Sequence, residues 1–215
     1  MKKHEVTEFF TRLRAENPEP RSELEYSNPY TLLIAVVLSA QATDAGVNKA
    51  TKALFRKADS PVKMLALGLE VVRDHIKTIG LYNNKAKNIM ALSERLIIEH
   101  GGNVPDTLEE LVKLPGVGRK TANVVLNVAF GQPTMAVDTH IFRVSNRTGL
   151  AHGKNPEEVE ARLLKIVPPE FALNAHHWLI LLGRYTCKAR KPLCSRCPVR
   201  DLCGWKEKEN NKKPA

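Results

Sequence analysis

The sequence predicts an all-α protein, and two observations support that fold class. Apolar residues recur at helical spacing in one short segment after another, and glycines or prolines separate these segments. Sustained alternation of apolar and polar residues, which is typical of a strand with one face in solvent, is not found along the sequence. We therefore expect short helices joined by turns.

The helices can be placed in order from this pattern. Residues 4–16 form an amphipathic helix, and residues 17–28, which contain two prolines, form a linker. The helix that begins at Pro29 is apolar on almost every face, so it should lie in the centre of a domain. The further helices are expected at residues 44–57, 61–66, 69–77, 83–100, 107–113, 120–130, 139–147, 156–166 and 171–182.

Composition limits the compartment and the class of partner. The 215 residues include 33 Lys plus Arg against 23 Asp plus Glu, a net charge of +10 that favours a polyanionic partner. The N-terminal segment lacks the apolar core of a secretory signal. The longest apolar run, residues 32–38, is far shorter than the roughly 20 residues that span a bilayer. We expect a soluble intracellular protein whose polar tail, from Lys206 to Ala215, is frayed.

The segment LPGVG at residues 114–118 predicts a tight turn between two helices. Pro115 ends the first helix, because it has no N–H and disfavours helical geometry in the residue before it. Gly116 and Gly118 permit positive φ and allow another backbone to approach closely. A glycine turn that opens a helix leaves N–H groups for a phosphate. The segment therefore predicts a helix-hairpin-helix, which grips a nucleic-acid backbone without reading bases.

Two residues near this turn are candidates for chemistry. Lys120 lies in the first turn of the second helix, where the helix N-terminus, the adjacent Arg119 and partial burial would each favour a neutral, nucleophilic amine. Asp138 precedes the next helical pattern. Taken singly, the two residues have simpler interpretations, since Lys120 could be a phosphate contact and Asp138 an N-cap.

Four cysteines near the C-terminus predict a metal site. Cys187, Cys194, Cys197 and Cys203 are spaced C-x6-C-x2-C-x5-C within 17 residues, and in a reducing compartment such clustering indicates metal rather than disulfides. The single C-x2-C pair suits a cubane cluster better than zinc, but spacing alone leaves zinc open. Basic residues that would offset the negative charge of a cluster or contact phosphates are Lys188, Arg190, Lys191, Arg196 and Arg200.

Several motifs together resemble the endonuclease III family of DNA glycosylases with abasic-site lyase activity. They are LPGVGRKTAN at 114–123, VDTHIFRV at 137–144, SAQATD at 39–44, IGLYNNKA at 79–86 and the four cysteines. The resemblance covers nearly the whole chain. It implies that Lys120 is the catalytic lysine, Asp138 the catalytic aspartate, and the cysteines the ligands of a [4Fe-4S] cluster.

The resemblance also implies how the protein holds DNA. Gln41 would fill the gap left by an extruded nucleotide, and Leu81 would wedge into the base stack. Without the resemblance, Gln41 belongs to a polar helix end and Leu81 is a packed loop residue. The hairpin contacts would come from Gly116, Val117, Gly118 and Arg119. A monovalent cation could be held by the backbone carbonyls of Val112, Leu114 and Val117.

The architecture implied by the resemblance is two all-α domains with a cleft between them. Residues 22–132 would form a six-helix domain that carries the hairpin, and residues 1–21 with 133–215 the iron–sulfur domain. Lys120 and Asp138 would then face each other across the cleft. The partner would be double-stranded DNA with damaged pyrimidines or abasic sites, and no membrane. The protein would be a monomer, cytoplasmic and associated with the nucleoid.

Two other functions remain open at this point. Adenine-mismatch glycosylases share the hairpin, the aspartate and the cluster, but they generally lack a lysine at position 120 and carry a large extra C-terminal domain. A non-catalytic DNA-binding module with a structural metal is the second alternative. Borohydride trapping of a covalent adduct with DNA would separate this module from a lyase.

Overall fold

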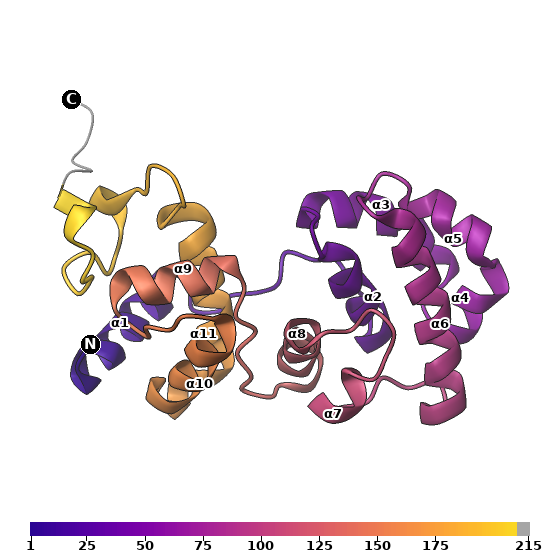
Figure 1. The fold of residues 1–215 in the computed structure, drawn as a ribbon, viewed down its shortest axis with the longest axis horizontal. Helices are drawn as coiled ribbons and strands as arrows, with labels where there is room; N and C mark the ends of the chain where they lie inside the picture. The colour runs from indigo at the N-terminus through magenta and orange to yellow at the C-terminus, as the bar shows by residue number, and fades with distance from the viewer. Residues whose placement is uncertain (210–215) are drawn as a thin grey trace. The chain divides into compact units, whose positions relative to one another are not determined.

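A computed structural model describes residues 1–209 of the chain, and throughout these residues the secondary structure is helical, with no strand (Figure 1). The all-α prediction is confirmed. The helices are α1 (Lys3–Glu16), α2 (Pro29–Ser39), α3 (Asp44–Lys57), α4 (Pro61–Leu67), α5 (Leu69–Ile76), α6 (Tyr82–His100), α7 (Leu108–Leu111), α8 (Arg119–Phe130), α9 (Thr139–Thr148), α10 (Pro156–Ile166) and α11 (Pro169–Leu181).

Two features after α11 were not predicted. The helix continues as a π-helical turn, Leu182–Thr186, which leads into the first cysteine. The tail was expected to be frayed, but Lys206–Glu209 forms a 3-10 turn. The Nζ of Lys208 donates hydrogen bonds to the carbonyls of Arg200 at 3.1 Å and Cys203 at 2.5 Å, which gives this turn an anchor. Residues 210–215 lie outside the described part of the chain.

The chain divides into two compact units, and the first consists of Ser22–Gln132. Helix α2 lies in its core, as predicted, and its residues from Tyr30 to Leu38 are buried. Asn28 caps this helix, because its side-chain oxygen accepts a hydrogen bond of 2.8 Å from the N–H of Thr31. Helices α3, α6 and α8 pack against α2, so the elements that carry the hairpin share one core.

The second unit joins Met1–Arg21 to Pro133–Ala215. Figure 1 shows α1 beside α11, although the two helices are far apart in the sequence. The rings of Phe10 and Phe171 stack at 5.8 Å, and the Trp178 indole donates a hydrogen bond of 2.7 Å to the carbonyl of Asn17. The Arg12 guanidinium donates to the carbonyl of Pro198 at 3.1 Å. The N-terminal helix is thus part of the unit that carries the cysteine loop.

Within the described residues, no helix is both long and apolar enough to cross a membrane.

Candidate active site and metal centre

The hairpin turn between α7 and α8 is held in place by α6. Gly116 has a φ of 78°, as predicted for a glycine in this turn, and a Cβ there would lie 2.9 Å from the side-chain nitrogen of Asn88. The Arg95 guanidinium donates a hydrogen bond of 2.6 Å to the carbonyl of Lys113, just before the turn. Helix α6 therefore packs against the turn and holds it in place.

Gly118 does not use the positive φ that glycine permits. Its φ of −91° and ψ of 172° are open to any residue. Gly118 is the N-cap of α8 and has no side chain to accept from the N–H groups of the first turn. A Cβ at this position would meet no atom within 4 Å. The turn therefore presents open space beside the positive end of a helix, which suits a phosphate.

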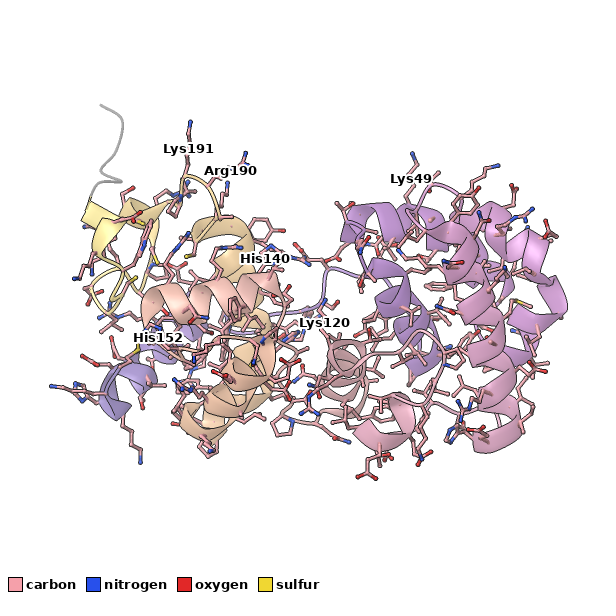
Figure 2. All side chains as sticks on the ribbon, viewed as in Figure 1. Lys49, Lys120, His140, His152, Arg190 and Lys191 are labelled. Atoms are coloured by element: carbon pink, nitrogen blue, oxygen red, sulfur yellow. The ribbon has the colours of Figure 1, made fainter. Side chains whose placement is uncertain are left out.

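Lys120 is in the first turn of α8, as predicted, but its side chain is exposed rather than partly buried (Figure 2). The reason lies in the register of the helix, because the buried stripe of α8 runs through Ala122, Val125 and Leu126. Arg119 is exposed as well, whereas Val117 is buried and packs in the core of this unit. The amine is thus presented outwards, beside the glycine turn.

Asp138 belongs to the other unit and is the N-cap of α9. Its Oδ1 accepts hydrogen bonds from the N–H groups of His140 at 2.8 Å and Ile141 at 2.9 Å. Its Oδ2 lies 3.0 Å from the Nδ1 of His140, and the side chain is 14% exposed. The capping interpretation is therefore correct as a structural fact. The capping hydrogen bonds fix the orientation of the Asp138 carboxylate, and they are compatible with a catalytic role.

Gln41 and Leu81 share an uncommon backbone conformation. Their φ angles are 56° and 60°, and among residues 1–209 the other non-glycine residue with positive φ is Lys191. Such a conformation costs of order 1–3 kcal/mol in a residue with a side chain and persists where the surroundings enforce it. Both side chains are exposed, Leu81 by 59%. The predicted insertion residues therefore project from strained turns.

The carbonyls proposed for a monovalent cation lie along the hairpin. Val112 is the C-cap of α7 and is exposed, whereas Leu114 is buried. The carbonyl of Leu114 accepts a hydrogen bond of 3.1 Å from the N–H of Val117 and keeps a second lone pair. The cation site stays a prediction.

The four cysteines line one pocket, together with Arg147, Arg200 and Trp205. Four thiols that line the same pocket fit a cluster ligated at four points. Burial raises the pKa of the Cys197 thiol to about 11 and also raises that of Cys194. The raised pKa values favour the protonated thiols, whereas ligation requires thiolates. A bound cationic iron centre would favour the thiolates instead.

Basic side chains around the loop take two different positions. Lys188, Arg190, Lys191 and Arg196 are exposed, and Figure 2 shows Arg190 and Lys191 extending outwards from the loop. Arg200 is half-buried. The exposed side chains are accessible to a phosphate, and their contact with DNA stays a prediction.

Two arginines of α9 that hold the loop were missed by the sequence analysis. Arg143 donates hydrogen bonds to the carbonyls of Cys187 at 3.0 Å and Gly183 at 2.8 Å. Arg147 lies 3.6 Å from the sulfur of Cys187 and stacks over the Trp205 ring at 4.4 Å. Their spacing of four residues puts both on one face of α9. The sequence does not show whether that face contacts the cysteine loop or faces solvent.

Comparison with known proteins identifies the family of this chain. A sequence profile described as HhH-GPD superfamily base excision DNA repair protein matches residues 34–169. The chain is 61% identical over 208 residues to endonuclease III of Escherichia coli (strain K12), across 97% of this chain and 99% of that protein. The chain belongs to the endonuclease III family. Endonuclease III of Haemophilus influenzae (strain Rd) is 60% identical over the same shares of the two chains.

Solved endonuclease III structures and a second profile agree with this assignment. A trapped covalent intermediate of endonuclease III with DNA matches 99% of this chain and 100% of its own, with 47% identity and a TM-score of 0.90. A non-covalent endonuclease III–DNA complex matches with a TM-score of 0.91. The profile for the iron–sulfur binding domain of endonuclease III matches residues 187–203, so the cofactor of this endonuclease III relative is a [4Fe-4S] cluster.

Family membership also settles the class of activity. Endonuclease III proteins are DNA glycosylases with abasic-site lyase activity, and this chain is a base-excision repair enzyme of that kind.

Proposed function

We propose that this enzyme removes oxidised pyrimidines from double-stranded DNA and then cleaves the abasic site, with Lys120 as the nucleophile and Asp138 as its electrostatic partner. The observation that carries the assignment of Lys120 is its place in the first turn of α8. It is exposed there, directly after an N-cap glycine with no side chain. A phosphate gripped by this turn would bring the sugar of a damaged nucleotide within reach of the amine.

The reaction begins with extrusion of the damaged nucleotide, which costs a few kcal/mol of stacking and pairing. Gln41 occupies the space left in the duplex, and Leu81 enters the base stack beside it. Both side chains are exposed on turns with a fixed backbone, as such a role requires. The remaining affinity comes from backbone contacts of Gly116, Val117, Gly118 and Arg119, and from the exposed basic residues of the cysteine loop.

The chemistry then proceeds through a Schiff base. The neutral amine of Lys120 attacks C1′, the bond from C1′ to the base breaks, and the base leaves with that electron pair and a proton. The carboxylate of Asp138 stabilises the positive charge that develops on the sugar and relays the proton that the amine loses when it bonds to C1′. Opening of the sugar gives a protonated imine with Lys120, which acidifies the C2′ proton. Loss of that proton expels the 3′ phosphate by β-elimination.

The two compact units fit the domains that the resemblance implies. Ser22–Gln132 carries the hairpin, Gln41 and Leu81, and the other unit carries Asp138 and the cysteine loop. The first unit, which is described in full, holds seven helices, α2 to α8, rather than the six that the resemblance implies. We propose that the two units act as a hairpin domain and an iron–sulfur domain on the same nucleotide. We further propose that the enzyme works as a cytoplasmic, nucleoid-associated monomer.

Borohydride trapping tests the assignment of Lys120. The wild-type protein should form a covalent adduct with duplex DNA that contains an abasic site, because reduction of the imine makes the link permanent. Lys120→Gln should give no adduct, while its affinity for a duplex with a tetrahydrofuran abasic analogue stays within a few-fold of wild type. Lys113→Gln, an exposed lysine before the same turn, is the matched control and should trap normally. Undiminished trapping by Lys120→Gln would move the nucleophile to another residue.

A further inference from the structure

Lys85 is a buried lysine that the reaction described above does not use. It lies in the first turn of α6 and is 5% exposed, although lysine is almost never buried without a partner. Its Nζ donates hydrogen bonds to two main-chain carbonyls, those of Leu38 at 2.9 Å and Ala40 at 2.6 Å. Burial lowers the pKa of this amine. The side chain therefore donates hydrogen bonds to two specific acceptors within the same unit.

The two acceptors lie where α2 ends. Leu38 is in the last turn of that helix, where carbonyls have no partner within the helix, and Ala40 follows its last residue. A cation at the C-terminus of a helix is also favoured by the helix dipole. Lys85 thus takes the place of the missing N–H donors and fixes the path of the chain as it leaves α2.

That path leads directly into Gln41. The N–H of Ala42 donates a hydrogen bond of 3.0 Å to the carbonyl of Ser39, and Ala40 has a φ of −57° and a ψ of 117°. With the φ of 56° at Gln41, these values describe a type II turn, whose third position normally takes glycine or asparagine. The ammonium of Lys85 binds the carbonyl immediately before this unfavourable residue. It therefore helps to enforce a conformation that glutamine would not adopt by preference.

Lys85 is also connected to Leu81. Its own N–H donates a hydrogen bond of 3.0 Å to the carbonyl of Leu81, the left-handed residue that precedes α6. One residue therefore bonds through its main chain to the Leu81 turn and through its side chain to the Gln41 turn. Both connections lie inside Ser22–Gln132, so they do not depend on the other unit.

We propose that Lys85 is a positioning residue that holds the Gln41 and Leu81 turns in a fixed relation, so that both side chains enter the duplex together. This inference rests on the proposed insertion roles of Gln41 and Leu81. Preorganised turns avoid the cost of ordering two loops during binding, and that advantage grows as the nucleotide is extruded. A lysine that only stabilised the core would affect folding but not insertion.

The test compares three single variants. Lys85→Met keeps most of the unbranched stem and removes the donors. Lys87→Met removes an exposed charge from the same helix. Ser93→Ala removes the buried 2.6 Å hydrogen bond between Ser93 and Tyr30, and so weakens the same unit without touching either turn. If Lys85→Met yields too little folded protein, Lys85→Gln replaces it, since its shorter amide cannot span both carbonyls.

Two readouts separate positioning from stability. Fluorescence of 2-aminopurine opposite a tetrahydrofuran abasic analogue reports unstacking by the inserted residues, without chemistry. At saturating protein, Lys85→Met should lose most of this signal, and its single-turnover base release should fall about tenfold or more. Both control variants should keep the signal and the rate within about twofold. A wild-type signal and rate in folded Lys85→Met would overturn the inference, as would equal losses in Ser93→Ala.

A double-mutant cycle with Gln41→Ala identifies the residue through which Lys85 acts. If Lys85 works by placing Gln41 together with Leu81, then Lys85→Met should reduce the signal by a smaller factor in the Gln41→Ala background than in wild type. Losses that simply multiply would overturn the inference while leaving the role of Gln41 intact. If Gln41→Ala alone leaves the signal unchanged, Gln41 has no insertion role and this inference fails with it. The assignment of Lys120 as the nucleophile would be unaffected, because borohydride trapping tests it separately.

Discussion

The Nε of Arg143 donates a hydrogen bond of 3.0 Å to the carbonyl of Cys187, the first of the four cysteines. The same helix, α9, begins at the cap residue Asp138. The candidate catalytic carboxylate and the cysteine loop are therefore attached to one rigid element. A change that loosens the loop should reach Asp138 through α9, even though the cluster takes no part in the proposed chemistry.

Replacing Arg143 by leucine should weaken the cysteine loop. The variant loses the hydrogen bonds to Cys187 and Gly183 and leaves both carbonyls without that donor. We expect a loss of about 1–3 kcal/mol in the free energy of unfolding, together with faster release of iron to a chelator. Arg162→Leu, an exposed arginine on α10 of the same unit, is the control and should change neither quantity. Wild-type iron retention in Arg143→Leu would show that the loop is held by the cluster alone.

The cysteine loop should hold about four irons per chain, with a broad absorbance near about 400 nm and a yellow-brown colour. The pocket lined by four thiols and the spacing of the cysteines both lead to this expectation. Cys197→Ser should lower the iron content and the yield of folded protein, because metal binding and folding of such a loop are coupled. Metal analysis of anaerobically prepared protein is the measurement, and stoichiometric zinc without iron would contradict it.

The helices could be predicted from the sequence because their signals are local. Apolar spacing and glycine or proline punctuation placed α3 and α10 at the residues that the structure shows. The packing of α1 against α11 could not be predicted in this way, because it joins residues such as Phe10 and Phe171 that no local pattern connects. The π-helical turn before Cys187 depends on the same kind of long-range packing.

The site was less predictable than the fold. Motifs singled out Lys120, Asp138 and the cysteines as candidates, but the sequence does not show which glycine of the turn has the positive φ, Gly116 or Gly118. Lys85 did carry a signal. It falls in register with Ile89, a buried residue of α6, at a spacing where a lysine contradicts the apolar pattern. Its acceptors could not be inferred, since they are main-chain atoms of another helix.

The two hairpin glycines should respond differently to alanine. Gly116→Ala forces a side chain into the left-handed region and against Asn88, so it should lose about 1–2 kcal/mol of stability from the backbone alone. Adding Asn88→Ala should relieve only the steric clash, so the loss of stability from the backbone conformation should remain. Gly118→Ala should cost less, about 0.5–1 kcal/mol, because its Cβ meets no atom of the chain and the loss comes only from alanine being a poorer N-cap than glycine. Its DNA affinity should nevertheless fall if a phosphate approaches this position, and filter binding measures that loss.

The last prediction separates the two roles of Asp138. Asparagine at this position can still accept hydrogen bonds from the N–H groups of His140 and Ile141, so Asp138→Asn should change the free energy of unfolding by less than about 0.5 kcal/mol. Asp138→Ala removes the cap and should cost about 1 kcal/mol. The amide carries no charge, so single-turnover release of an oxidised pyrimidine by Asp138→Asn should fall by about 100-fold or more. Denaturant unfolding and rapid-quench kinetics measure the two quantities in the same preparation. Full activity in Asp138→Asn, with Asp138→Ala unstable, would reduce Asp138 to the cap of α9.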